Sequence, residues 1–481
     1  MNVSAIKRTL GSMLIFEAIF FLLPLVTAVI YWERAFFAFL ISIAICLAVG
    51  GLCLIGKRRD GEVYAKEGFI IVSLGWIIMS LFGALPFWLS GSIPSYIDAL
   101  FETVSGFTTT GATIMPSGAA IEALPKSVLM WRSFTHWIGG MGVLVFLMAF
   151  LPLSGAKNMH MMKAESPGPQ VSKLVPKVRQ TAKILYLIYS ALTLLQLILM
   201  LCGGMPLFDA ITTAFGTAGT GGFSVKGDSM AGYSVYLQIV VTVFMLLFSI
   251  NFNSYYLLGR GRWKEALNTE VKVFFCIVFG AIALIVANLC ITEQYTLWEA
   301  LLHAPFAVAS IISTTGFATE DFNLWPSFSK GILVMLMFVG ACAGSTGGGI
   351  KVSRWVMLSK GATHEVRRIL HPKQVKKITM DKKVVEHEVV RSMNAYVIAY
   401  VLIFVISWLL VSLEGYDMTT NFTAVSATIN NVGPGLELVC PTGSFAFFSD
   451  WSKLVFIFDM LAGRLEIFPM LILFTPSTWR K

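Results

Sequence analysis

The sequence predicts an all-α polytopic membrane protein in which four tandem repeats of helix, reentrant loop and helix follow two N-terminal transmembrane helices. Three observations predict this fold. The 481 residues are 56% hydrophobic and 13% charged, with a mean hydropathy of +0.75, whereas soluble domains carry about 25% charged residues. Ten apolar runs are long enough to cross roughly 30 Å of hydrocarbon. Four shorter segments rich in Thr, Ser and Gly recur between pairs of these runs.

The first two apolar runs stand apart from the repeats as an accessory pair, residues 1–67. Lys7 and Arg8 precede the first run, which is too long for a signal-peptide core and shows no small-residue cleavage pattern, so we expect a retained signal anchor. The repeats then occupy residues 68–180, 181–267, 268–388 and 389–481. The ten runs lie at about residues 10–31, 34–55, 68–90, 127–153, 181–203, 232–258, 268–291, 327–358, 389–413 and 451–475.

The net charge of +9 is explained by membrane topology. Most of the 36 lysines and arginines precede the first run, follow an even-numbered run or end the chain. All of these clusters lie on one side of the membrane if both termini are cytoplasmic, as the positive-inside rule favours. We therefore expect no nucleic-acid partner. The seven cysteines show no CxxC spacing and fall mostly inside apolar runs, so we expect neither disulfides nor a zinc site, and their role is core packing.

The four Thr- and Gly-rich segments indicate internal repetition. Asp98 stands thirteen residues before Gly111, and Asp209 stands thirteen before Gly222. The fourth segment aligns only if it carries about one extra residue. Glycine after an apolar helix ends that helix in a tight turn, and irregular backbone at membrane depth is tolerated where it lines a wet cavity. Four such turns imply one shared axial cavity. The segments are residues 98–113, 209–224, 303–319 and 419–435.

The turns have the chemistry of a filter for a monovalent cation. A dehydrated K⁺ ion needs oxygen ligands, which backbone carbonyls supply, and glycine lets a chain turn its carbonyls toward an axis. The absence of carboxylates within the turns disfavours a divalent ion. The alternative is that these glycines only end buried helices. The predicted K⁺-binding residues are Thr109, Thr110, Gly111, Thr220, Gly221, Gly222, Thr314, Thr315, Gly316, Asn431, Val432 and Gly433, with Asn430 beside them.

Four acidic residues lie near the turns. They could concentrate cations at the mouth of the pore, or they could belong to a solvated loop face. These residues are Glu102, Glu320, Asp321 and Glu437.

Six motifs together resemble the Trk/Ktr/HKT superfamily of potassium transporters, and within it the bacterial TrkH type, over the whole chain: SGFTTTGATI, FGTAGTGGFS, STTGFATED, TINNVGPG, GSTGGGIK and GRLEIF. The resemblance implies a pseudo-fourfold pore, a homodimer with one pore in each subunit, and a bacterial inner-membrane location. It also implies a cytosolic TrkA-type nucleotide-binding regulatory ring, through which alone a nucleotide would act. Each repeat keeps a single glycine, unlike the TVGYG loops of tetrameric K⁺ channels, so we expect weaker selectivity for K⁺ over Na⁺.

The eighth apolar run contains the glycine-rich stretch GACAGSTGGGIK, residues 340–351. Each glycine costs a helix roughly 1 kcal/mol relative to alanine, so we expect a loop beneath the filter. Gly344 and Gly349 have the spacing of a phosphate-binding P-loop, but Ile350 stands where that motif requires lysine, so we exclude a P-loop. Close helix packing by small residues is the alternative to a gate. The resemblance implies that the loop is a gate, formed by Gly344, Ser345, Thr346, Gly347, Gly348 and Gly349.

Arg464 lies inside the last apolar run, and an intramembrane arginine is a functional candidate because it is costly. Asp459 and Glu466 are its possible partners. Similar proteins carry a basic residue here, facing the pore below the filter. Arg464 could therefore oppose a passing cation, or form a structural ion pair. The basic segment 364–388 could dock a cytosolic partner or rest on anionic lipid.

These features predict channel-like uptake of K⁺ across the cytoplasmic membrane. A potential of about 100 mV contributes roughly 2.3 kcal/mol per charge moved inward, so a passive conductor is sufficient. The alternative is a Na⁺- or H⁺-coupled symporter, for which Glu17 and Asp459 are the candidate intramembrane acids. No nucleophile, metal cluster or acid–base pair points to an enzyme, and K⁺ is the only ion or cofactor expected. A membrane scaffold without permeation is the remaining class.

Overall fold

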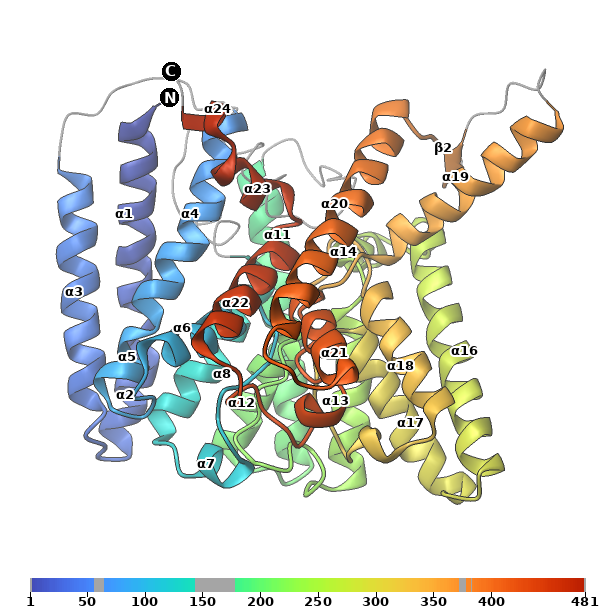
Figure 1. Cartoon of the computed structure of the whole chain (residues 1–481). Helices are drawn as coiled ribbons and strands as arrows, with labels where there is room; N and C mark the ends of the chain where they lie inside the picture. The colour runs from blue at the N-terminus through green and yellow to red at the C-terminus, as the bar shows by residue number, and fades with distance from the viewer. Residues whose placement is uncertain (1, 56–64, 143–177, 372–377, 382, 480–481) are drawn as a thin grey trace.

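The computed structural model describes residues 2–55, 65–142, 178–371, 378–381 and 383–479. Its regular structure is almost entirely helical. Among the described residues the one sheet is a small antiparallel hairpin, β1 (Thr379–Met380) with β2 (Lys383–Val384). Both termini lie at the same end of the molecule, and long helices run from there toward the opposite end (Figure 1). The predicted all-α polytopic membrane fold is confirmed.

The accessory pair packs as two antiparallel spans and is attached to the first repeat. A methyl group on Gly11 would lie 2.8 Å from the Gly50 carbonyl oxygen, so only glycine permits this helix crossing. In the turn between the spans, the Glu33 carboxylate accepts the backbone N–H groups of Lys126 (2.5 Å) and Ser127 (2.9 Å), which caps the second long helix of repeat 1. The pair comprises α1 (Val3–Phe20), α2 (Leu22–Ile30) and α3 (Phe36–Leu54).

Each repeat consists of a long first helix, a short reentrant helix, a mostly irregular segment and a second helix. Repeat 1 contains α4 (Ala65–Gly83), α5 (Leu85–Leu89), α6 (Tyr96–Phe107), α7 (Gly118–Glu122) and α8 (Lys126–Gly140). Repeat 2 contains α11 (Val178–Cys202), α12 (Leu207–Gly219), α13 (Val235–Phe248), α14 (Phe252–Gly259) and α15 (Trp263–Ala266). Repeat 3 contains α16 (Thr269–Ile291), α17 (Leu297–Ile312), η1 (Phe322–Leu324), α18 (Ser327–Val339) and α19 (Val352–Leu370). Repeat 4 contains α20 (His387–Ser412), α21 (Met418–Ile429), η2 (Glu437–Val439), α22 (Asp450–Arg464), α23 (Phe468–Phe474) and α24 (Pro476–Trp479).

The four short helices α6, α12, α17 and α21 all end within four residues of a filter glycine. Helices α6, α12 and α21 begin fifteen residues before that glycine, whereas α17 begins nineteen before it. The extra residue expected in the fourth repeat is therefore wrong, and the longer copy is the third. A capping box between Thr296 and Glu299 starts α17 one turn earlier than its counterparts.

The second helix of a repeat is broken at mid-depth more often than we predicted. The sequence predicts a break only in repeat 3, but α13 and α14 also meet at 91°, and α22 and α23 are separated by Glu466 and Ile467 with positive φ. Residues 143–153 of the fourth apolar run lie outside the described residues. Among the described helices, six are long and apolar enough to cross a membrane, or seven if α13 and α14 count as one. The breaks in repeats 2 and 4 were not predicted, because apolar composition reports membrane depth and not backbone continuity.

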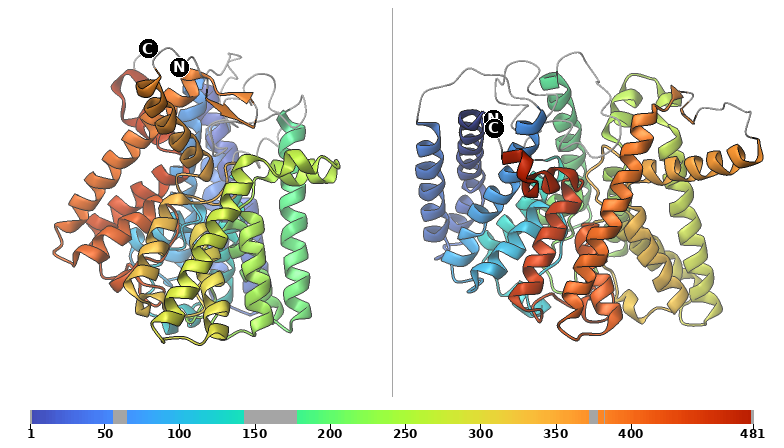
Figure 2. Two further views of the ribbon diagram at one scale, coloured as in Figure 1. Left: turned by 90° about the vertical axis from the view of Figure 1, so that its right-hand side faces the viewer. Right: turned by 45° about the horizontal axis from the view of Figure 1, so that its top comes forward.

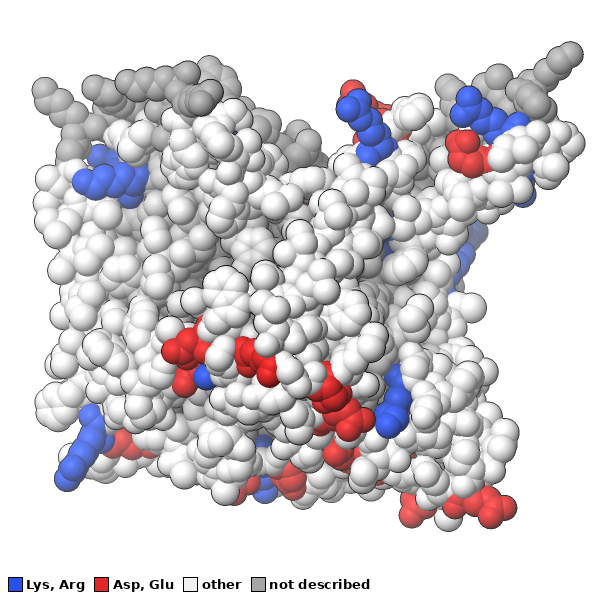
Figure 3. Space-filling model, viewed as in Figure 1, with Lys and Arg blue, Asp and Glu red and all other residues white. Residues whose placement is uncertain are grey.

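The outward surface is apolar. Large side chains such as Phe37 on α3, Phe279 on α16 and Leu402 on α20 are more than half exposed, and an uncharged belt separates the charged ends on the face drawn in Figure 3. This surface suits contact with lipid. All seven cysteines are free, and Cys202 and Cys276 are exposed on it, so the core-packing role expected for cysteines fails for these two. Helix α19 leaves the bundle at the end that carries the termini (Figures 1 and 2).

Candidate functional site

The four predicted filter glycines form a closed ring around a common axis. All have positive φ, from 77° at Gly222 to 96° at Gly433. Each α-carbon faces the carbonyl oxygen of the residue before the glycine of the next repeat, and repeat 4 returns to repeat 1. A methyl group on Gly433 would lie 2.7 Å from that oxygen, and methyl groups on the other three would lie closer still. The neighbours are Gly111 with Gly221, Gly222 with Thr315, Gly316 with Val432, and Gly433 with Thr110.

The same backbone path is repeated four times. The residue before each glycine donates its N–H to the carbonyl five positions earlier, at 2.8 or 2.9 Å, and the residue before that donates to the carbonyl three positions earlier. That second residue is always left-handed, with φ between 55° and 60°, which is rare for a β-branched side chain. The surrounding structure must therefore hold this strain. The left-handed residues are Thr109, Thr220, Thr314 and Asn431.

The electrostatics of the ring suit a cation. The C-terminal ends of α6, α12, α17 and α21 all converge on it, and the end of each helix carries partial negative charge. Side chains brace the ring: the Asn431 amide donates to the Thr110 hydroxyl (3.0 Å) and to the Met460 carbonyl (2.9 Å). This contact joins repeat 4 to repeat 1.

His136 on α8 is a ring-supporting residue that the sequence analysis did not single out. Its Nε2 accepts the Phe223 N–H at 3.2 Å, so the ring proton belongs on Nδ1, which lies 2.8 Å from the Gly106 carbonyl oxygen. A methyl group on Gly221 would collide with this imidazole. His136 thus links the end of α6 in repeat 1 to the filter segment of repeat 2. A histidine inside an apolar run was the signal available in the sequence.

Glu102 does not act as a surface charge at the pore mouth. It is 1% exposed, pairs with Arg132 at 2.5 Å, and accepts the Thr113 hydroxyl and the Ile114 N–H, each at 3.0 Å. It therefore holds the extended segment that follows Gly111. Of the other predicted acids, Glu320 accepts the Trp325 indole N–H, Asp321 caps η1, and Glu437 is exposed.

We expect Glu102→Gln to lower the free energy of unfolding by about 3–5 kcal/mol, because it leaves the Arg132 guanidinium buried without its counter-charge. Thermal unfolding in detergent measures the loss. Glu437→Gln, at an exposed acid near the same turns, is the control and should change stability by less than about 0.5 kcal/mol. Equal stability of the two variants would contradict a bracing role for Glu102.

The predicted break at residues 340–351 is present, and the loop lies directly against the filter segments. The Gly348 N–H donates to the Thr314 hydroxyl (2.6 Å), and the Gly349 N–H donates to the Asn430 carbonyl (3.0 Å). The Thr346 hydroxyl reaches the Phe248 carbonyl of repeat 2 at 3.1 Å. A methyl group on Gly348 would collide with the Asn430 carbonyl oxygen, so this approach requires small residues.

Arg464 donates to three backbone carbonyls: Thr346 at 2.7 Å, Gly139 at 2.6 Å and Gly140 at 2.7 Å. It therefore joins the loop of repeat 3 to the end of α8 in repeat 1. The carboxylates suggested as its partners make their hydrogen bonds elsewhere: Asp459 accepts the Ser407 hydroxyl at 2.7 Å, and Glu466 forms an ion pair with Arg354. The backbone break after Arg464 redirects Glu466 toward α19.

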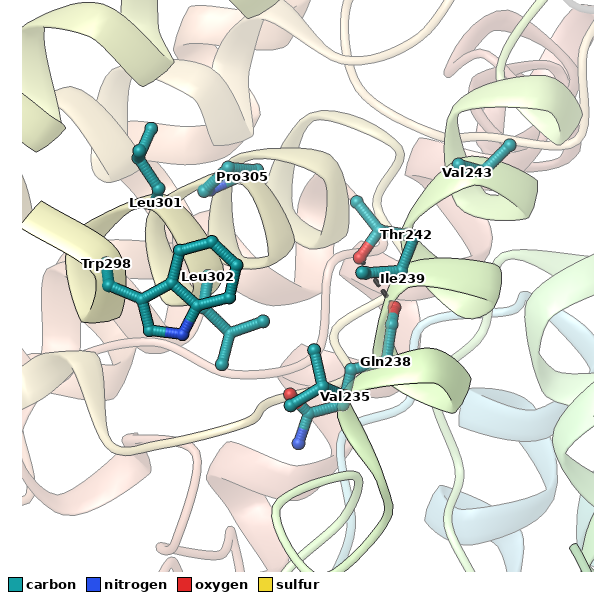
Figure 4. A pocket seen from close by; sticks show the side chains of 9 residues that line it. All are labelled: Val235, Gln238, Ile239, Thr242, Val243, Trp298, Leu301, Leu302 and Pro305. Atoms are coloured by element: carbon teal, nitrogen blue, oxygen red, sulfur yellow. Dashed lines mark hydrogen bonds between the residues drawn. The ribbon is translucent and has the colours of Figure 1, made fainter. Parts of the chain in front are cut away.

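Hollows also lie outside the ring. A cavity of about 370 Å³ between α19, α20 and α23 is lined by Arg354, Tyr396 and Glu466, together with Glu386 and Glu388. It lies next to the C-terminal flank of the loop. A second, apolar groove of about 190 Å³ separates α13 from α17 (Figure 4). It contains none of the predicted site residues and belongs to the outward apolar surface.

Comparison with known proteins gives concordant matches. The model of the TrkH family, described as a cation transport protein, matches residues 35–481. The chain is 36% identical over 492 residues to the Trk system potassium uptake protein TrkH of Salmonella typhimurium, and 36% identical over 494 residues to that of Escherichia coli strain K12; both alignments cover 100% of each chain. The crystal structure of the potassium transporter TrkH from Vibrio parahaemolyticus matches with a TM-score of 0.89 at 34% identity, covering 100% of both chains.

Proposed function

This chain belongs to the TrkH family of cation transport proteins, and from that premise we propose that it takes up K⁺ by channel-like, potential-driven permeation through the ring of four glycine turns. The observation that best supports this proposal is the ring itself, in which each glycine packs against a carbonyl of the next repeat. Four rigidly held carbonyls can replace water around a weakly hydrated cation. The transported ion is K⁺, as in the names of the potassium uptake proteins to which the chain is similar.

Residues 344–349 are the proposed gate. They lie against Thr314 and Asn430 of the filter segments, and Arg464 ties them to α8. A loop held by a few hydrogen bonds can move aside at modest cost, since each such bond contributes about 0.5–1.5 kcal/mol, or 1.5–3 to a charged group. Movement of this loop would open the path toward the end that carries both termini, which we assign to the cytoplasm.

A cytosolic TrkA-type nucleotide-binding ring is the proposed regulator, and the active form is a homodimer in the bacterial inner membrane. The relatives are named as parts of a Trk system. The basic segment 364–388 lies on the proposed cytoplasmic side; its first residues continue α19 as far as Leu370, and residues 372–377 and 382 fall outside the described residues. Helix α19 leads directly from the gate to this segment, which supports partner docking there.

A proton-coupled symporter is the second candidate, and one residue favours it. Glu17 is fully buried against the accessory face of repeat 1, and neither carboxylate oxygen has a hydrogen-bond partner among the described residues. Buried intramembrane acids are the residues from which proton relays in transporters are built. Glu17 lies against Gly83, away from the ring, so we place it outside the ion path.

Flux into proteoliposomes tests the proposal. At an inside-negative potential of about 100 mV, the purified protein should take up Rb⁺ as a K⁺ tracer, and the rate should not change when a Na⁺ or pH gradient is imposed. Uptake that requires either gradient would favour the symporter. Absence of uptake under all three conditions would exclude both transport mechanisms.

A further inference from the structure

One carboxylate holds both ends of the proposed gate. Glu270, in the first turn of α16, is 4% exposed. Its Oε1 accepts the N–H of Ala343 at 2.7 Å and the N–H of Ser353 at 3.1 Å. Ala343 lies where the loop begins and Ser353 lies in the first turn of α19. A single oxygen therefore joins the entry of the loop, the exit of the loop and the helix beside them.

These two bonds favour the conformation in which the loop lies under the filter. A buried carboxylate needs partners because its desolvation is costly, and N–H bonds to a charged acceptor are about twice as strong as neutral ones. Ala343 cannot move with the loop unless it leaves Glu270. Displacing the loop thus breaks a charge-assisted bond and exposes an unsatisfied carboxylate, and both effects stabilise the closed position.

Thr269, the residue before Glu270, is held by hydrogen bonds to the β1–β2 hairpin. Asp381, in the turn of the β1–β2 hairpin, accepts both the backbone N–H (2.8 Å) and the hydroxyl (2.7 Å) of Thr269. The same hairpin is bonded to the other flank of the loop, because the Lys360 ammonium on α19 donates to the Thr379 carbonyl at 2.8 Å. The hairpin therefore contacts the two helices, α16 and α19, that carry the partners of the Glu270 clamp.

We propose that Glu270 is the positioning residue that clamps the gate closed, and that the β1–β2 hairpin sets the position of this clamp through Asp381. The inference rests on the proposed function, because it assumes that the loop is a gate. A partner that draws the hairpin away from Thr269 would shift the N-terminus of α16 and, with it, the Glu270 carboxylate. The clamp is then the point at which an event on the cytoplasmic side reaches the loop.

The first test is Rb⁺ flux into proteoliposomes with the full chain and no regulatory partner. Loss of two hydrogen bonds to a charged group should raise basal flux about tenfold or more in Glu270→Ala. Glu270→Gln, which keeps an acceptor oxygen without the charge, should show a smaller rise. Glu265→Gln is the matched control, since Glu265 is exposed and forms an ion pair with Arg262 at the surface, and the flux of this variant should equal that of the wild type.

A second readout separates the clamp from the gate. Cys342 is fully buried within the loop, so in a variant that keeps only this cysteine, labelling by a membrane-impermeant maleimide reports loop displacement. We expect Glu270→Ala to increase both labelling and flux. If labelling rises while the flux of both Glu270→Ala and Arg464→Ala stays at the wild-type rate, the loop is not a gate. If Arg464→Ala raises flux but Glu270→Ala changes neither quantity, the clamp is wrong and the gate stands.

A double-variant cycle tests the hairpin. Asp381→Asn should raise basal flux less than Glu270→Ala does, because it acts through Thr269. The double variant should conduct no more than Glu270→Ala alone, since the clamp is already absent. Multiplicative effects of the two substitutions, or no effect of Asp381→Asn, would overturn the role of the hairpin.

Discussion

Replacing Gly222 by alanine is expected to reduce K⁺ uptake at least about a hundredfold, to the background of empty vesicles. The new methyl group would collide with the Thr315 carbonyl oxygen, and the backbone φ of 77° is itself unfavourable for alanine by about 1–2 kcal/mol. The ring can relieve the collision only by moving that carbonyl. Initial rates of Rb⁺ uptake into proteoliposomes measure the loss.

Gly280→Ala is the matched control for this substitution. Gly280 lies on α16, where an added methyl group would have nothing within 4 Å, so this variant should transport at the wild-type rate. Retention of normal uptake by Gly222→Ala would show that the ring is not the ion path.

The four ring glycines should also differ in how much transport activity remains after substitution by alanine. A methyl group on Gly433 meets its neighbour at 2.7 Å, a milder approach than at the other three, so Gly433→Ala should retain the most activity of the series. Gly316→Ser should change the ratio of Na⁺ to K⁺ flux, because the serine displaces the Val432 carbonyl. An unchanged ratio would mean that the filter has been assigned to the wrong residues.

Arg464→Ala is expected to raise cation flux about tenfold or more without any regulatory partner. The guanidinium makes three bonds to backbone carbonyls, one of them on the proposed gate at Thr346 and two at the end of α8, and each bond to a charged group contributes about 1.5–3 kcal/mol. Its removal also takes a positive charge away from the region beneath the ring. Both changes favour passage of a cation, and Rb⁺ flux measures their sum.

Arg464→Lys separates the two effects. Lysine keeps the charge but lacks the planar fork that reaches carbonyls on two different segments. High flux in Arg464→Lys would assign the effect to the lost bonds, and low flux would assign it to the charge. Unchanged flux in Arg464→Ala, together with a lower folding yield, would instead indicate a structural arginine.

The positions of the four glycine turns could be predicted from the sequence because the chemistry of the turns is local. Each turn is a glycine with a left-handed residue two positions before it, and each glycine lies three or four residues after the end of a helix. Threonine in that conformation was less predictable. The strain at Thr109, Thr220 and Thr314 is held by contacts between repeats, and these are absent from any local pattern.

Other features could not be predicted because they depend on packing across the bundle. The bend between α13 and α14 occurs in a run whose composition resembles an ordinary span. Glu102 looked like a surface acid until its neighbours were known, since Arg132 stands thirty residues away. Asp459 and Glu466 were reasonable partners for Arg464 by sequence distance, yet a backbone break turned Glu466 toward Arg354 instead.

The closing contact of the ring has a consequence for how the protein is made. The Asn431 amide reaches Thr110 across 321 residues of sequence, so the fourth repeat must be inserted before the circle is complete. Until then the first three repeats hold a gap where the fourth belongs. During synthesis the ring is therefore incomplete until the last hairpin docks. Translation order thus delays completion of the ring until Arg464, which contacts the neighbouring loop at Thr346, is also in place.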